Sequence, residues 1–120
     1  MRRILIADDM TNGRELIRTV LERAGYEVLE AADGRQALEK IHAEKPDLVI
    51  LDLQMPILNG YDVLSQLRAD EAFKHMPVLA LTANAMQGDR EKALAAGFTS
   101  YLPKPVSLSN LREQISTLLG

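Results

Sequence analysis

The sequence predicts an α/β fold, a doubly wound parallel sheet in which five strands alternate with five helices. Two observations predict it. Short runs of branched apolar residues alternate along the chain with longer segments whose apolar residues recur at helical spacing. One run, residues 48–51, contains four consecutive branched apolar residues, which is typical of a strand buried on both faces. Such alternation favours parallel strands joined by right-handed crossovers.

The first predicted strand, residues 4–7, is an apolar run that leads directly into a pair of acids. A helix follows, which we expect Thr11 or Asn12 to cap and Gly25 to end. The buried face predicted for it contains Leu16, Ile17, Val20, Leu21 and Ala24.

The second strand is predicted over residues 27–31, where apolar and acidic residues alternate as on a partly exposed edge. Asp33 then reads as a helix cap, with Gln36 at the position that reaches back to the helix start. Pro46 lies just beyond the end of this helix. Its predicted buried face contains Ala37, Leu38 and Ile41.

The third strand, residues 48–51, ends at Asp52. Because burying a charge is costly, we expect Asp52 at the mouth of a crevice and not inside the core. Pro56 and Gly60 end regular structure beyond it. A third helix begins near Gly60, and its predicted buried face contains Val63, Leu64 and Leu67.

The fourth strand is predicted over residues 77–81 and ends on Thr82. Residues 87–96 read as a helix that stops at Gly97, but its apolar anchors are mainly Met86, Leu94 and alanines. We therefore predict that this helix is the least firmly packed, with a low free energy of local opening.

The fifth strand is predicted over residues 99–102, and Ser107 can cap a last helix beyond it. The apolar residues that recur at helical spacing in this helix are Leu108, Leu111, Ile115 and Leu118.

Composition narrows the class of protein. The length of 120 residues suffices for one compact domain, which we expect to span residues 1–120. The net charge of -3 and the scattered basic residues argue against nucleic-acid binding. The absence of cysteine excludes disulfide frameworks and thiolate zinc sites. No apolar run approaches the roughly 18 residues of a membrane span, and no leader pattern opens the chain, so we expect a cytoplasmic protein without membrane contact.

Polar side chains follow four of the five predicted strands, at the point where each strand ends. They are Asp8 and Asp9 after the first strand, Asp52 after the third, Thr82 after the fourth and Lys104 after the fifth. In a doubly wound sheet, ligands bind beside the carboxyl ends of the strands. We therefore expect these side chains to form one site.

The chemistry of that site follows from its charges. Three carboxylates repel one another unless protons or a cation intervene, and Mg²⁺ or another divalent cation accepts such oxygen ligands while bridging to phosphate. A lysine and a hydroxyl would complete a pocket for a phosphoryl group. There is no cysteine, and neither His42 nor His75 falls at a strand end, so the covalent acceptor is a carboxylate, with Asp52 the best placed.

In this order and spacing, the residues resemble the receiver domain of bacterial response regulators. The matching motifs are Asp8-Asp9, Asp52 within Leu-Asp-Leu-Gln-Met-Pro-x-x-Asn-Gly, Leu81-Thr82-Ala83 and Tyr101-x-x-Lys104-Pro105. The resemblance covers the whole chain. It implies the flavodoxin-like (βα)5 form of the fold, with strand order 2-1-3-4-5.

The resemblance also implies a signalling function. Asp52 would accept a phosphoryl group from a histidine kinase or a histidine phosphotransfer protein in a two-component phosphorelay. The Mg²⁺ ligands would be Asp9, Asp52 and the main-chain carbonyl of Gln54, with Asp8 acting through water. Such a phosphoprotein is not a turnover enzyme, because it catalyses only its own phosphorylation and dephosphorylation.

Further roles are implied for residues near the acceptor. Thr82 and Lys104 would bind the phosphoryl oxygens, Tyr101 would change rotamer when Thr82 moves, and the bond between Lys104 and Pro105 would be cis. Gln54 and Asn84 stand where neutral amides can orient water, from which we infer autodephosphorylation.

The implied output surface consists of the helix over residues 87–96, the strand over residues 99–102 and the last helix. Its partner would be a downstream protein, an output domain outside this chain or a second copy of the chain. The weak packing predicted for residues 87–96 agrees with this, because a poorly anchored helix suits a switch.

Three alternatives use the same features. A receiver-like scaffold that is never phosphorylated would only bind partners, but the intact acidic, Thr and Lys positions argue against it. A phosphatase with an aspartate nucleophile, of the haloacid dehalogenase type, needs a second acid where this chain has Met10. A nucleotide or flavin binder is disfavoured because no G-x-G-x-x-G follows the first strand.

Overall fold

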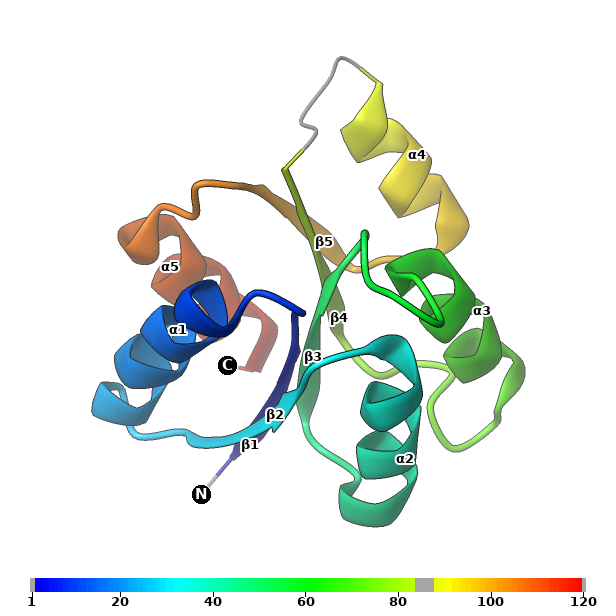
Figure 1. Ribbon diagram of the computed structural model, residues 1–120, viewed down its shortest axis with the longest axis horizontal. Helices are drawn as coiled ribbons and strands as arrows, with labels where there is room; N and C mark the ends of the chain where they lie inside the picture. Colours follow the sequence, from blue (N-terminus) through cyan, green and yellow to red (C-terminus); the bar gives the residue numbers. More distant parts are fainter. Residues whose placement is uncertain (1, 84–87, 120) are drawn as a thin grey trace.

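A computed structural model describes residues 2–83 and 88–119, and in it five parallel strands form one sheet between two layers of helices (Figure 1). The strand order is β2-β1-β3-β4-β5, which confirms the predicted flavodoxin-like topology and places β2 at an edge. The elements are β1 Arg3–Ala7, α1 Thr11–Arg23, β2 Glu27–Ala31, α2 Gly34–Glu44, β3 Leu48–Asp52, α3 Gly60–Ala69, β4 Val78–Thr82, α4 Asp89–Ala96, β5 Ser100–Pro103 and α5 Leu108–Leu119.

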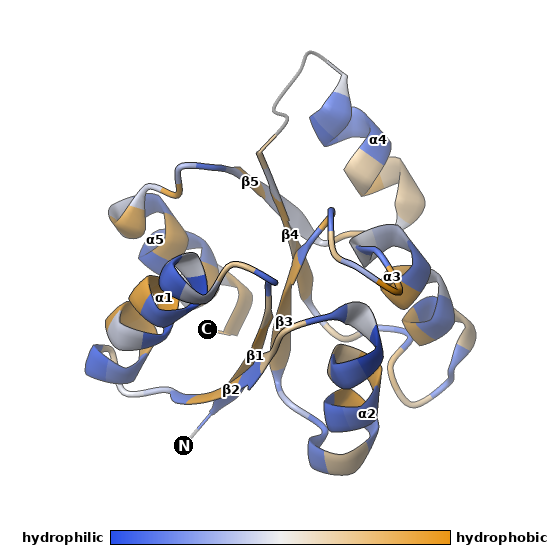
Figure 2. Cartoon of the chain, viewed as in Figure 1, coloured by the Kyte–Doolittle hydropathy of each residue, from blue (hydrophilic) through white to orange (hydrophobic). Residues whose placement is uncertain are grey.

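The sheet separates two apolar cores. Helices α1 and α5 cover one face, and α2, α3 and α4 cover the other (Figure 1). Figure 2 shows hydrophobic residues along the central strands and hydrophilic residues on the outer sides of the helices. Every residue of β3 and β4 is buried, as expected for central strands covered on both faces.

Helix α1 differs from its prediction at the start and along its face. Its N-cap is Met10, without a side-chain cap, and neither Thr11 nor Asn12 caps it. The reason is local: the Asp8 carboxylate accepts the Met10 N–H at 2.9 Å, so the turn closes before the helix begins. Leu16 is 54% exposed because it lies one position off the buried stripe of Ile17 and Leu21. Val20 is half-buried and Ala24 exposed, so the buried face is narrower than predicted.

Helices α2 and α3 begin with side-chain caps. Asp33 accepts the Gln36 N–H at 2.8 Å, as predicted, and Gln36 reaches back to the N–H of Ala32, one residue before the cap. In α3, Asn59 and Asp62 form a reciprocal capping box. The residues predicted to face the core from both helices are buried.

Helix α4 is the most weakly anchored helix. It buries only Ala93, fewer residues than any other helix, as the packing prediction required. The predicted anchor Met86 and the predicted first residue, Gln87, lie outside the described residues. At its carboxyl end, the guanidinium of Arg68 on α3 donates to the Gly97 carbonyl and to main-chain carbonyls of the segment before β4.

In α5, Ser107 accepts the Asn110 N–H at 3.3 Å, in agreement with its predicted role as a cap. Leu111, Ile115 and Leu119 are buried, whereas the predicted Leu118 is half-buried. A spacing of four residues continues the stripe through 119, which explains the difference. Within the described ranges, no helix combines the length and apolarity that crossing a membrane requires.

Candidate functional site

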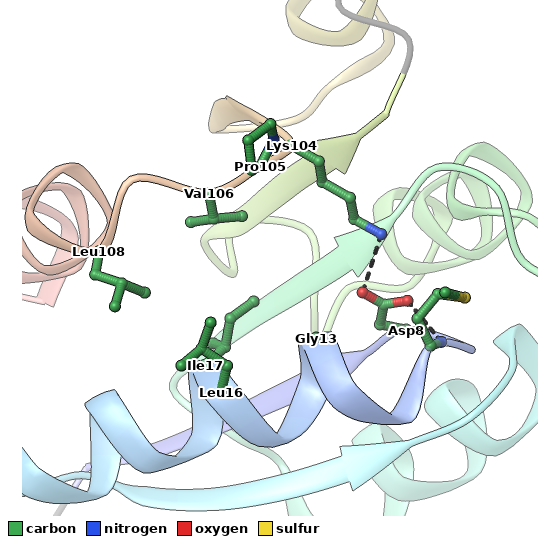
Figure 3. A pocket seen from close by; sticks show the side chains of 9 residues that line it. Asp8, Gly13, Leu16, Ile17, Lys104, Pro105, Val106 and Leu108 are labelled. Atoms are coloured by element: carbon green, nitrogen blue, oxygen red, sulfur yellow. Dashed lines mark hydrogen bonds and ion pairs between the residues drawn. The ribbon is translucent and has the colours of Figure 1, made fainter.

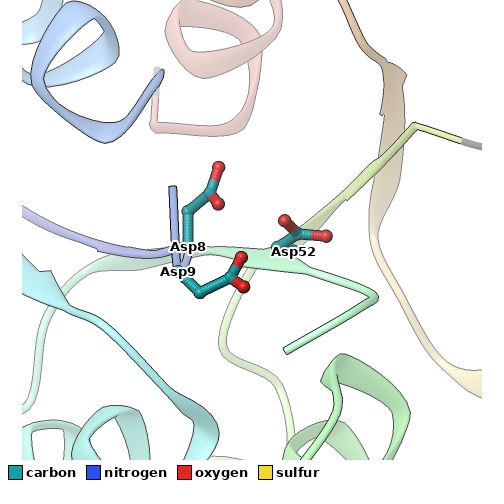
Figure 4. A group of neighbouring side chains, drawn as sticks. All are labelled: Asp8, Asp9 and Asp52. Carbon is teal, nitrogen blue, oxygen red and sulfur yellow. The ribbon is translucent and has the colours of Figure 1, made fainter. Parts of the chain in front are cut away.

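Three carboxylates meet at the carboxyl edge of the sheet. Asp8 and Asp9 follow β1, and Asp52 is the last residue of β3 (Figure 4). Each offers an oxygen, and these oxygens lie within 4.8 Å of one another. Asp8 is 1% exposed and Asp52 4% exposed, whereas Asp9 is exposed. The predicted convergence therefore occurs because β1 and β3 are hydrogen-bonded neighbours.

A lysine that follows β5, an edge strand of the sheet, contacts the two buried acids. Lys104 follows β5, and its Nζ lies 2.7 Å from Asp52 Oδ2 and 3.1 Å from Asp8 Oδ2. The Lys104 main-chain N–H donates to the Thr82 carbonyl at 2.7 Å, which ties the loop after β5 to the end of β4. Thr82 is buried at that end. Thus Asp8, Asp9, Asp52, Thr82 and Lys104 all occupy the same edge of the sheet, as predicted.

Burial and charge act together on the ionisable groups. Burial is the main cause that raises the pKa of Asp52, and Asp8 adds to it, while Lys104 and the Gln54 N–H lower it by less. Burial acts to lower the pKa of Lys104, but its hydrogen bonds and charge interactions with Asp52 and Asp8 outweigh burial and raise it. Burial therefore dominates at Asp52, whereas the neighbouring negative charges dominate at Lys104.

The site contains the residues that a hard divalent cation requires. With Asp8, Asp9 and Asp52 ionised and Lys104 protonated, three negative charges meet one positive charge, which leaves two negative charges to balance. Carboxylate oxygens are the ligands that Mg²⁺ prefers. The residues present therefore fit the ion.

Asp52 lies deeper than predicted, because it is buried and not at the mouth of a crevice. Its charge is compensated in place: Lys104 binds Oδ2, and the Gln54 N–H donates to Oδ1 at 3.0 Å. Gly60 lets the start of α3 lie close to the end of β3, since a Cβ at this position would be 2.6 Å from the Asp52 carbonyl oxygen. The Asp52 carboxylate is thus held at both oxygens, and α3 lies close against its main chain.

The remaining predicted residues lie on neighbouring segments. Tyr101 is half-buried on β5, opposite Ala80 of β4, and burial raises the pKa of its hydroxyl. The bond between Lys104 and Pro105 is cis, as the resemblance implied. Asn84 lies outside the described residues.

A cavity of about 300 Å³ opens beside Asp8 and Lys104, between α1 and the segment leading to α5 (Figure 3). Apolar side chains make up most of its lining, among them Met10, Leu16 and Val106. Sequence reasoning missed this cavity because it assigned Leu16 to the buried face of α1.

Sequence reasoning also missed Arg14. Its guanidinium donates to the main-chain carbonyl of Asp8 at 2.7 Å and to Glu30 at 3.0 Å. The acid at position 30, near the carboxyl end of a predicted strand, was the only available signal that a cation would lie close by.

Comparisons with known proteins agree with this geometry. The family model of the response regulator receiver domain matches residues 4–116. The chain is 35% identical over 117 residues to the polar-differentiation response regulator DivK of Brucella anthropi, a match that covers 98% of this chain and 95% of that protein. It is 39% identical over 123 residues to hybrid signal transduction histidine kinase I of Dictyostelium discoideum, and that match covers 97% of this chain and only 7% of the kinase.

A solved structure shares the fold closely. It is the receiver domain of a sensor histidine kinase from Pseudomonas aeruginosa, crystallised with a magnesium ion coordinated in its active site cleft. The TM-score is 0.91 and the identity 36%, over 99% of this chain and 98% of that one.

Proposed function

We propose, from the premise that this chain belongs to the response regulator receiver domain family, that Asp52 is the residue that accepts the phosphoryl group. The chain is a receiver domain of two-component signalling. The proposal adds the role of each residue in the site. The observation that carries it is the contact of Lys104 with both buried carboxylates, Asp52 and Asp8. We further propose that residues 1–120 belong to one receiver domain.

The proposed ion is Mg²⁺ or another divalent cation, held by Asp9, Asp52 and the main-chain carbonyl of Gln54, with Asp8 acting through water. When bound, the ion would neutralise charge on the carboxylates and on the phosphoryl oxygens. Support comes from the short separations among the three acids and from the two negative charges that Lys104 leaves uncompensated.

The proposed transfer is a displacement at phosphorus. A carboxylate oxygen of Asp52 forms the new P–O bond, the P–N bond of a partner's phosphohistidine breaks, and the electron pair of that bond leaves with the imidazole. The Lys104 ammonium donates to Asp52 Oδ2 in the unphosphorylated chain. On transfer it would move to the incoming phosphoryl oxygens, to which the Thr82 hydroxyl would also donate. Positioning and charge neutralisation are the contributions this chain makes.

The same site would lose the phosphoryl group to water without another protein. Gln54 follows Asp52 by two residues and donates its main-chain N–H to the carboxylate, and its side-chain amide would orient the attacking water molecule. The second amide proposed for this role, Asn84, lies outside the described residues. The chain thus catalyses its own phosphorylation and dephosphorylation and turns over no separate substrate.

The signal would leave through α4, β5 and α5. Tyr101 lies on β5 beside the strand that carries Thr82, and α4 buries a single residue, so this helix can rearrange at low cost. A downstream protein, an output domain or a second copy of the chain would bind this surface.

Receiver domains interact with histidine kinases and downstream targets, and the proposed phosphodonor is a histidine kinase or a histidine phosphotransfer protein. The relatives include a response regulator of similar length and a hybrid kinase of which this chain spans a small part. The cytoplasmic location expected from the sequence stays a prediction.

The test is phosphorylation by a small-molecule donor. Acetyl phosphate with Mg²⁺ should add one phosphoryl group to the wild type and none to Asp52→Asn, as measured by intact mass. Asp62→Asn is the matched control, because Asp62 is an exposed acid of the α3 cap, and this variant should still be modified. Modification of Asp52→Asn would contradict the assignment, and an unmodified wild type would support the unphosphorylated scaffold.

A further inference from the structure

The peptide that joins Asp8 to Asp9 is held by a side chain from outside the acidic cluster. Its carbonyl oxygen accepts a hydrogen bond from the Arg14 guanidinium at 2.7 Å. On the other side of Asp8, its main-chain N–H donates to the Ala31 carbonyl at 3.1 Å, which continues the pairing of β1 with β2. The chain is thereby held on both sides of Asp8.

Arg14 is itself held in place. Its Nε donates to Glu30 at 3.0 Å, while a different nitrogen of the same guanidinium reaches the Asp8 carbonyl. Since the guanidinium is planar and its donors form a rigid fork, two hydrogen bonds from different nitrogens determine its orientation. The Arg14 side chain is 15% exposed, so solvent competes little with these bonds.

Holding this carbonyl affects both acids. A peptide group is planar, so its orientation sets ψ of Asp8 and φ of Asp9 together. These two angles decide where the Asp9 carboxylate points relative to Asp8. Rotation of the plane would turn Asp9 away from the point at which the three acids meet.

The charge of Arg14 would act in the opposite sense. A positive group near the acidic cluster repels a divalent cation, so on Coulomb grounds alone its removal should strengthen cation binding. If Arg14 acts by positioning, its removal should weaken binding. The two roles therefore predict changes of opposite sign.

We propose that Arg14, fixed by Glu30, is a positioning residue that orients the Asp8–Asp9 peptide so that both carboxylates face one divalent cation. The inference rests on the proposed function, because it assumes that the ion binds at Asp8, Asp9 and Asp52. It adds to that function a residue of α1 and a residue of β2 that touch neither the ion nor the phosphoryl group.

Arg18 provides a matched control. It also pairs with Glu30, at 2.8 Å, but its side chain is 47% exposed, and among the described contacts none joins it to Asp8 or Asp9. Arg18→Gln therefore makes the same change of charge, four residues further along α1, and removes an ion pair to the same acid. It leaves the Asp8 carbonyl bond in place.

The experiment measures Mg²⁺ affinity by isothermal titration calorimetry on the 120-residue chain. Arg14→Gln should weaken affinity by about tenfold, the size usually seen when a partner that orients a metal ligand is removed. Arg18→Gln should leave it unchanged or slightly stronger. Urea unfolding without Mg²⁺ shows whether each variant is folded. An Arg14→Gln variant that is folded and binds Mg²⁺ as tightly as the wild type, or more tightly, would overturn the inference.

Two further variants keep the test decisive if Arg14→Gln fails to fold. Arg14→Lys keeps the charge but has one nitrogen for two acceptors, so it should also lose affinity, and unchanged affinity would contradict the proposal. Glu30→Gln should weaken binding without touching α1, because Arg14 loses its charged anchor. A wild type that binds no Mg²⁺ would instead contradict the proposed function.

Discussion

Asp52 illustrates at the scale of a single residue how the site lowers the stability of the fold. Its carboxylate is buried at the end of a central strand, and burial raises its pKa more than Lys104 and the Gln54 N–H lower it. The ionised form is therefore less favourable in the folded chain than in the unfolded chain. Sites built for function commonly reduce stability in this way.

Replacing this acid should stabilise the fold. When the pKa of an acid is higher in the folded chain than in the unfolded chain, its contribution to stability depends on pH. The contribution is fully present below the unfolded-state pKa, near 3.9, and is lost as pH rises through the folded-state pKa. At pH 7 the ionised group thus has a cost, which Asp52→Asn removes while Asp8 still pairs with Lys104. We expect a gain of the order of 1 kcal/mol in the free energy of unfolding, measured by urea titration in EDTA.

Measuring the stability difference between Asp52→Asn and the wild type at two pH values tests whether ionisation of Asp52 causes it. At pH 4 the difference between Asp52→Asn and the wild type should shrink, because the wild-type acid becomes protonated. Glu71→Gln, a neutralised acid on an exposed segment, should show little difference at either pH. Lower stability of Asp52→Asn at pH 7 would show that the Lys104 pair more than compensates burial.

At the scale of elements, periodicity predicted all ten elements, because each strand or helix carries its signal within a few residues, whereas the order of the strands came from the family resemblance. It did not predict the exposure of Leu16. Helical spacing shows which residues share a face, but the neighbouring element decides how much of that face is covered. The N-cap at Met10 was missed for a similar reason, since it depends on a bond to Asp8.

Helix α4 should open more readily than α5. It buries Ala93 alone, whereas α5 buries Leu111, Ile115 and Leu119, and few buried apolar contacts mean a low free energy of local opening. Hydrogen exchange measured by NMR at pH 7 should give amides of residues 89–96 lower protection than amides of residues 111–119. Equal protection of the two helices would contradict this expectation.

At the scale of the whole molecule, the site joins segments that are distant in the sequence. Asp52 and Lys104 are 52 residues apart, and Arg14 and Glu30 are 16 apart. The first pair was predictable because parallel strands end at a common edge, so topology alone brings their last residues together. The second was not, since Arg14 lies within a helix, and its spacing does not distinguish it from the other arginines of α1.

Cation binding at this edge should stabilise the entire fold. An ion that binds only the folded chain adds about 2.7 kcal/mol when its concentration is a hundred times its Kd. Mg²⁺ should therefore raise the Tm of the wild type by several degrees, as measured by thermal unfolding monitored by circular dichroism. Asp9→Asn should lose most of this increase, because Asp9 is a proposed ligand and is exposed.

Salt screening is the control for this measurement. NaCl at equal ionic strength weakens repulsion among the acids without binding in their place, so it should raise Tm less than Mg²⁺ does. The same increase with both salts, or an undiminished response in Asp9→Asn, would mean that general screening and not a bound ion is responsible.

The contacts of Arg68 give the two ends of α4 unequal freedom. At the carboxyl end, Arg68 binds the Gly97 carbonyl at 3.1 Å, and Phe98 is buried directly after it. At the amino end, Arg90 and Glu91 are exposed. We therefore expect a displacement of this helix to be a tilt about its carboxyl end. Such a tilt would move the amino end of α4 the most, so a small change beside Asp52 would displace that end further than the carboxyl end.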